Sequence, residues 1–234
     1  MPSSPLPTVR ALEGLWQQVS RRPLWAPPNF FRYLRLRRKT HLTVIDPARV
    51  RLLAPRWKVN DCSACTDICC VGPRATVLLR LRDIATLIDI GRTELMTLEK
   101  PAFSMADQEA RPALRRQMAS QAWSDFPTLR QNRMGACAAL TSSGKCGLYP
   151  DWPLACARFP YALHADAREV FYSRRCNSFW VRSDARERVT AMSVAVVASY
   201  NERIKDLVLL AYAPTELERL GLLRYVRHER IPVD

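Results

Sequence analysis

The chain has 234 residues, 48% of them hydrophobic and 25% charged, a composition that is typical of a folded protein and excludes a disordered one. It contains no apolar run of 18 residues, so we predict no transmembrane helix. The net charge is +14, and 31 of the 36 basic residues are Arg. This charge would suit nucleic acid or another acidic surface as a partner. The Arg residues are spread along the chain, however, which favours a solvated cationic face of a soluble protein.

The N-terminal part of the chain predicts two helices. Apolar residues recur at helical spacing over residues 9–22, and the pattern ends before a proline. Residues 29–39 predict a weaker helix or an extended arm. Residues 40–54 predict a short extended piece with a turn at Asp46-Pro47.

Residues 23–42 form the one local concentration of basic and aromatic side chains. We interpret this segment as docked on the core of the protein itself. An anionic membrane surface and a nucleic acid are the alternative partners for such a mixture. The side chains concerned are Trp25, Phe30, Phe31, Arg32, Tyr33, Arg35, Arg37, Arg38 and Lys39.

The middle of the chain mixes short elements of both kinds. Residues 75–81 are β-branched and apolar and predict a strand. Residues 82–91 predict a helix of two to three turns that ends at Gly91. Residues 93–100 predict a further short helix with a threonine as its N-cap. Residues 107–123 have a helical composition and predict a polar insertion on the surface.

The C-terminal half predicts two hairpins followed by helices. Residues 133–149 predict two short strands around a Ser-Ser-Gly turn. Residues 159–176 predict a second hairpin with its turn near 165–167. The longest predicted helix covers residues 184–213, and Pro214 opens a final helix.

The eight cysteines are the candidate functional residues of this sequence. They lie beside Gly, Pro, Ser, Asp and Asn, in predicted turns and hairpin ends, whereas cysteines that fill a core follow the apolar periodicity of helices. This placement favours metal ligands. The predicted ligands are Cys62, Cys65, Cys69, Cys70, Cys137, Cys146, Cys156 and Cys176.

The spacing within CSACTDICC (62–70) separates its four thiols. In a local helix, Cys62, Cys65 and Cys69 fall within about 60° of one another, and Cys70 points about 100° away from Cys69. One centre can therefore take the first three thiolates and a later cysteine, which leaves Cys70 for a neighbouring centre or another role. Eight thiolates suit two four-thiolate sites, or one site and a reactive pair.

The identity of the metal stays open between zinc and an iron–sulfur cluster, since both suit soft thiolate ligands. A zinc ribbon needs two CxxC pairs, and only Cys62 and Cys65 have that spacing. Eight thiolates are more than one structural zinc requires, which favours iron–sulfur. The start of the chain predicts no secretory signal, so we expect a cytoplasmic protein, in which a disulfide framework would be unusual.

Both cysteine blocks resemble a family of bacterial proteins named for the motif CxxCxxxCC and described as zinc- or iron-chelating. CSACTDICC matches the first block, and ATVLLRLRDIATL, with Asp83, is similar to the strand and acidic helix start that follow it. CAALTSSGKCGLYPDWPLACARFP (137–160) resembles the second block. The matching positions there are Cys137, Leu140, Cys146, Tyr149, Pro153, Cys156, Phe159 and Pro160.

This resemblance covers residues 60–180 and implies metal chelation by cysteine. Two positions depart from the family pattern, because Trp152 stands in place of an Arg and the Arg beside the third Cys comes one place later, as Arg158. Some relatives are flagellin lysine-N-methylases, which makes such an enzyme an alternative. The chain has only seven Gly and no glycine-rich loop for S-adenosylmethionine.

The sequence thus predicts a mainly helical α+β protein, with small β-hairpins and loops around a cysteine-ligated metal centre and a long C-terminal helix. We expect a basic and aromatic arm with a helix over residues 1–59, the metal-binding domain over 60–180, and a helical segment over 181–234. Redox chemistry, electron transfer or metal handling is the expected function, with an unknown protein partner. A basic nucleic-acid-binding protein with structural metal is a further alternative. Tyr149, Arg158 and Phe159 are expected to support the metal with hydrogen bonds and apolar cover.

Overall fold

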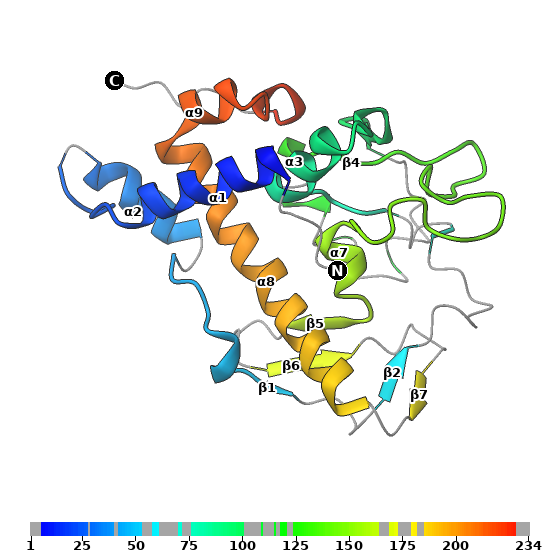
Figure 1. Ribbon diagram of the computed structural model, residues 1–234. Coiled ribbons are helices and arrows are strands. Elements are labelled where there is room, and N and C mark those ends of the chain that lie inside the picture. The colour runs from blue at the N-terminus through cyan, green and yellow to red at the C-terminus, as the bar shows by residue number, and fades with distance from the viewer. Residues whose placement is uncertain are drawn as a thin grey trace.

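One long helix, α8 (Ala185–Tyr212), forms the axis of the molecule (Figure 1). Helices α1 (Pro7–Ser20), α3 (Leu81–Asp89) and α9 (Pro214–Arg219) contact it, as does the short helix α7 (Leu154–Ala157). The sequence prediction of a mainly helical protein with a long C-terminal helix is therefore confirmed. The computed structural model describes residues 6–27, 29–39, 42–52, 58–60, 70–71, 76–100, 109, 115, 118–120, 124–163, 169–172, 179–181 and 185–227.

Three small sheets complete the described part of the fold. β5 (Tyr161–Leu163) and β6 (Glu169–Tyr172) form the predicted antiparallel hairpin, and β1 (Arg51–Leu52) pairs with β6 in parallel. β2 (Lys58–Asn60) pairs with β7 (Phe179–Val181), and β3 (Met96–Thr97) pairs with β4 (Thr128–Leu129), both antiparallel. Short 3-10 turns precede β1 at η1 (Pro47–Arg49) and β3 at η3 (Thr93–Leu95), and a third, η4 (Leu223–Tyr225), follows α9.

Helix α1 begins two residues before the predicted start, because Pro7 occupies its first turn and suits that position. Its N-terminal N–H groups are satisfied from another helix. The Asp89 carboxylate of α3 accepts hydrogen bonds from Thr8 N at 2.9 Å and from Val9 N at 3.1 Å. Lys205 of α8 reaches Glu13 of α1 at 3.1 Å, so polar contacts join α1 to both neighbouring helices.

Helix α3 ends as its sequence predicts. Gly91 has a φ of 67°, a left-handed conformation that glycine adopts without strain. The N–H of Arg92 donates to the carbonyl of Leu87 at 2.8 Å, and that of Gly91 donates to Ile88 at 3.0 Å. This pair of bonds satisfies the last carbonyls of the helix and turns the chain toward η3.

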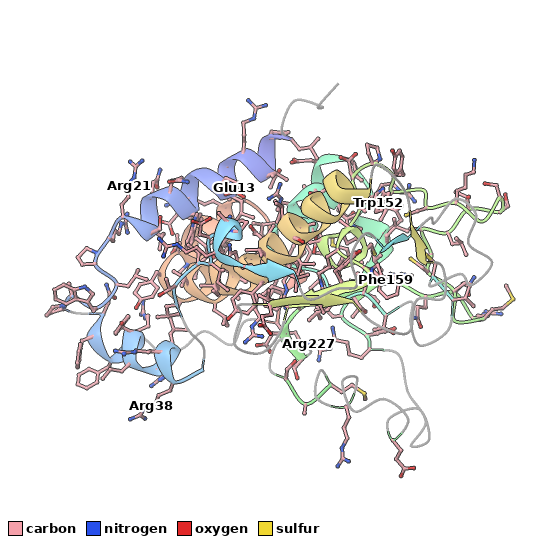
Figure 2. The ribbon with its side chains drawn as sticks, turned by 90° about the horizontal axis from the view of Figure 1, so that it is seen from below. Glu13, Arg21, Arg38, Trp152, Phe159 and Arg227 are labelled. Carbon is pink, nitrogen blue, oxygen red and sulfur yellow. The ribbon has the colours of Figure 1, made fainter. Side chains whose placement is uncertain are left out.

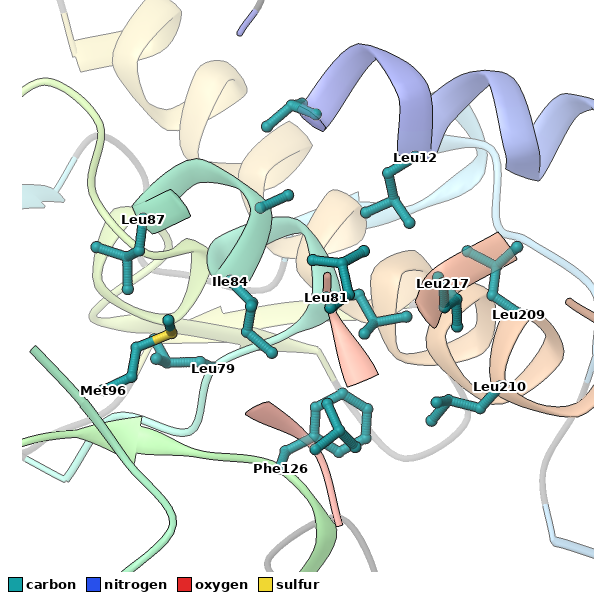
Figure 3. Close-up of a cluster of buried hydrophobic side chains, with 14 of the residues drawn as sticks. Leu12, Leu79, Leu81, Ile84, Leu87, Met96, Phe126, Leu209, Leu210 and Leu217 are labelled. Carbon is teal, nitrogen blue, oxygen red and sulfur yellow. The ribbon is translucent and has the colours of Figure 1, made fainter. Parts of the chain in front are cut away.

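The hydrophobic core lies where α1, α3 and α9 meet the C-terminal half of α8 (Figure 3). Leu12 of α1, Leu81 and Ile84 of α3, and Leu217 of α9 all point into it. Leu81 and Ile84 are fully buried, which stabilises the fold by about 1.5–3 kcal/mol for each side chain. No helix in the described part of the chain is long and apolar enough to cross a membrane.

Three sequence predictions of regular structure were wrong or only partly right. In the segment predicted as a strand, residues 76–80 form one isolated bridge, between Leu78 and Thr128, before α3 begins. Residues 93–100 form η3 and β3 instead of a helix. Residues 133–149 form turns with single bridges instead of two strands. The predicted helix at 107–123 lies largely outside the described residues.

Candidate metal centre

The structure describes four of the eight predicted ligands. Within the described ranges, no group of three or more Cys, His, Asp or Glu side chains is placed to hold a metal ion. Which cysteines share a site therefore stays a prediction. The described cysteines are Cys70, Cys137, Cys146 and Cys156, and the others, Cys62, Cys65, Cys69 and Cys176, lie outside the described residues.

The two cysteine blocks, far apart in the sequence, meet in the structure. The N–H of Cys137 donates a hydrogen bond to the carbonyl of Cys70 at 2.8 Å, and an antiparallel bridge joins Val71 to Ala136 beside it. Cys137 is buried in the main core, and Cys70 is partly buried against it. Cys70, whose spacing sets it apart from the other thiols of its block, contacts the second block through this backbone bond.

Residues 130–149, which we call the cysteine loop, fold into tight turns. The carboxamide oxygen of Asn132 accepts hydrogen bonds from Met134 N at 3.0 Å and Ala136 N at 2.9 Å, immediately before Cys137. A second turn, around Gly144 at a φ of 74°, leads back to an isolated bridge between Leu140 and Cys146. Hydrogen-bonded turns and this bridge therefore fix the backbone at both Cys137 and Cys146.

Cys156 lies on α7, and a buried carboxylate on α3 holds that helix in place. Asp83 Oδ1 accepts a hydrogen bond from Leu154 N, the first residue of α7, at 2.8 Å. Its other oxygen, Oδ2, accepts one from Arg80 N at 2.8 Å, before the first turn of α3. One side chain thus satisfies N–H groups at the start of two helices, which fixes α7 and Cys156 against the core.

Asp83 belongs to a buried group of charged residues that we call the polar cluster. Its members are Arg80, Asp83, Arg158, Glu202 and Asp206. Burial raises the pKa of Asp83 to about 6, although hydrogen bonds from Leu154 and Arg80 act in the opposite direction. Burial also raises the pKa of Asp206 to about 8, opposed by Arg80 and assisted by Glu202.

Asp206 links the polar cluster to the start of α3. Its Oδ1 accepts a hydrogen bond from Leu81 N at 3.2 Å, and its Oδ2 lies 3.6 Å from the Arg80 guanidinium. Sequence reasoning missed this cluster. A signal was available, because Glu202 and Asp206 lie four residues apart and so share one face of α8, where they interrupt the apolar pattern.

Two of the three predicted supporting residues lie beside Cys156. Burial and the neighbouring Arg80 lower the pKa of Arg158, and the charge of the Cys156 thiolate opposes that change. The Arg158 side chain donates to the carbonyl of Tyr161 at 3.0 Å, and the Phe159 N–H donates to the carbonyl of Cys156 at 3.1 Å. A cation next to a thiol favours the thiolate, which is the form that binds metal.

The third predicted supporting residue, Tyr149, lies at the surface with 71% of its side chain exposed. Its ring contacts that of Trp152, with the two centroids 5.3 Å apart. Trp152 is the residue that replaces an Arg of the family pattern, and its buried indole N–H has no hydrogen-bond partner among the described residues.

Comparison of the chain with protein-family models, with curated proteins and with solved structures gives no match.

Proposed function

We propose that this protein binds zinc or an iron–sulfur cluster through its clustered cysteines, in the manner of the CxxCxxxCC proteins that its two blocks resemble. Redox chemistry, electron transfer or metal handling is the function that such a centre would serve. The observation that carries the proposal is the direct contact of the two blocks, in which Cys137 N donates to the Cys70 carbonyl at 2.8 Å.

The chemistry of the surrounding residues supports the same proposal. Thiolates are the ligands that zinc and iron–sulfur clusters share. The cysteine loop packs Cys137, Ala139 and Leu148 into the main core, but it consists of hydrogen-bonded turns without a regular helix or strand. Bound metal would supply further folding energy to such a segment. Arg158 places a positive charge near Cys156, which favours the deprotonated thiol.

Anaerobic purification of the full chain, followed by metal analysis and a visible spectrum, tests the proposal. An iron–sulfur cluster is expected to give a visible absorption band that bleaches with dithionite, whereas zinc is expected in fixed stoichiometry in a colourless protein. Protein that retains neither zinc nor iron after anaerobic purification and reconstitution would overturn the proposal.

Paired variants distinguish the loss of a metal ligand from local damage to the fold. Cys70→Ser and Cys137→Ser each remove a thiol where the two blocks meet, and we expect the bound metal to fall to half or less. Ala138→Ser is the matched control, because it adds the same hydroxyl to the neighbouring, partly buried residue and removes no thiol. If all three variants retain the metal equally, Cys70 and Cys137 are not ligands.

A further inference from the structure

An aromatic and basic arm projects from the end of the molecule opposite the cysteine loop. The arm comprises residues 21–27 and 29–39 and contains helix α2 (Phe30–Lys39). Figures 1 and 2 both place α2 at one end and the cysteine loop at the other. Figure 2 shows Arg21 and Arg38 pointing away from the body of the protein at this end.

One face of α2 is docked on the protein, as the sequence analysis expected. Leu36 is buried, and the Arg32 side chain donates to the carbonyl of Ala211, near the end of α8, at 2.9 Å. The Arg32 guanidinium also lies 5.7 Å from the centroid of the Tyr212 ring. The Tyr212 hydroxyl in turn donates to the carbonyl of Leu24 at 3.1 Å. These contacts leave the opposite face of α2 exposed.

The exposed face of α2 combines rings with positive charges. At about 100° per residue, its exposed side chains span an arc of about 160° opposite Leu36. Phe30 and Phe31 are 46% and 79% exposed, and Trp25, just before the helix, is 61% exposed. Three arginines share this arc with the two phenylalanines. They are Arg35, Arg37 and Arg38, all exposed.

The charge of this region is entirely of one sign. No Asp or Glu occurs between Glu13 and Asp46, whereas seven Arg and Lys do, which equals half of the net charge of +14. A surface with exposed rings and uncompensated positive charge is complementary to a layer of anionic headgroups above an apolar interior.

The arrangement of the rings favours lipid over nucleic acid. Phe30 and Phe31 meet edge to face, with centroids 5.8 Å apart and planes at 71°, so they offer no parallel platform on which successive bases could stack. Phenylalanine also has no polar atom for a phosphate or a base edge. Buried at the boundary between headgroups and acyl chains, the same rings would gain by leaving water.

We propose that the exposed face of α2, together with Trp25, binds the surface of an anionic phospholipid membrane. The helix lies parallel to the surface, with its rings below the headgroups and its arginines among them. The rest of the protein stays in the aqueous phase.

Co-sedimentation of the purified 234-residue chain with vesicles tests this proposal. The two probes are phosphatidylcholine alone and phosphatidylcholine with about 30 mol% phosphatidylserine. We expect binding to the anionic vesicles that weakens as salt is raised, and little binding to the neutral ones. The fluorescence of Trp25 is expected to shift to the blue on binding, and Trp25→Phe is expected to abolish that shift.

A charge-matched pair of variants locates the surface. Arg37→Gln/Arg38→Gln is expected to weaken vesicle binding about 30-fold, because each basic residue near an anionic surface contributes about 1 kcal/mol. Arg49→Gln/Arg133→Gln removes the same charge from exposed positions outside the arm, and we expect a change of less than about threefold.

A separate variant tests the rings. Phe30→Ser/Phe31→Ser keeps the charge and is expected to weaken binding at least about tenfold, because the apolar insertion is lost. Equal binding to neutral vesicles, equal loss in the two arginine pairs, or no effect of the Phe variant would each overturn the proposal. Binding of single-stranded RNA with no binding to either vesicle would also overturn it.

Discussion

Replacing Asp83 with Ala is expected to loosen α7 around Cys156 while changing global stability in a pH-dependent way. The carboxylate accepts hydrogen bonds from Leu154 N and Arg80 N, both at 2.8 Å, and alanine accepts neither. Each buried N–H group that loses its partner costs about 1–3 kcal/mol. The variant therefore loses about 2–6 kcal/mol from these two contacts.

Removal of the buried Asp83 charge has the opposite effect, because it raises the free energy of unfolding. The pKa of Asp83 is raised from 3.8 to about 6, so the ionised side chain destabilises the folded wild type by about 3 kcal/mol above pH 6. The folded protein binds the proton more tightly than the unfolded chain does, so wild-type stability falls as the pH rises through this window. Asp83→Ala lacks that loss. The difference in the free energy of unfolding between the wild type and this variant should therefore be about 2 kcal/mol smaller at pH 7.5 than at pH 4.5.

Urea unfolding at the two pH values measures this difference, and amide exchange with thiol alkylation measures the local effect. We expect exchange at Leu154 and alkylation of Cys156 to accelerate about tenfold. Asp89→Ala is the matched control, since Asp89 lies on the same helix and accepts N–H bonds from the start of α1. It should destabilise the protein by about 1 kcal/mol and leave the alkylation rate of Cys156 unchanged. A deficit of Asp83→Ala that grows with pH, or equal alkylation of Cys156 in both variants, would refute the reasoning.

Two further predictions concern a second carboxylate and a helix end. Asp206, with a pKa of about 8, makes the wild type lose about 1.4 kcal/mol per pH unit between roughly pH 4 and pH 8, and urea unfolding of Asp206→Asn should show this slope removed. Gly91→Ala should cost about 1 kcal/mol, because the φ of 67° disfavours a side chain. Gly14→Ala, equally open but inside α1, should stabilise by up to about 1 kcal/mol, and thermal unfolding of both compares them. Equal effects of the two alanines would contradict the backbone argument.

The sequence predicted the helices well because their periodicity and end signals are local. Gly91 and Pro214 each mark a helix end by their own backbone restriction, and the structure has helix ends at or beside both. The short β-elements were harder to predict. Thr93 resembles an N-cap, yet Met96 and Thr97 pair with residues 128–129, a long-range contact that no local pattern reveals.

The sequence identifies candidate ligands, which stay a prediction, but it does not reveal the contacts that surround them. Clustered thiols are conspicuous in a sequence, so the cysteines can be named without a structure. Asp83 entered through the family resemblance, and its hydrogen bond to Leu154, 71 residues away, became visible only in the fold. Asp206 interrupts the apolar pattern of α8 in the sequence, but its partners, Leu81 and Arg80, become visible only in the fold. The predicted division into three segments stays a prediction.

The separation of the arm from the cysteine loop has a consequence for electrostatics. Helices α1, α3 and α8 lie between the two ends, and one helix with its side chains is about 10 Å thick. The Debye length at physiological ionic strength is about 8 Å. Through the surrounding salt solution, the potential of a charged layer that contacts α2 would thus be largely screened at the distance of Cys137 and Cys156. Attachment at one end would set the orientation of the molecule and leave the thiols at the other end in the aqueous phase.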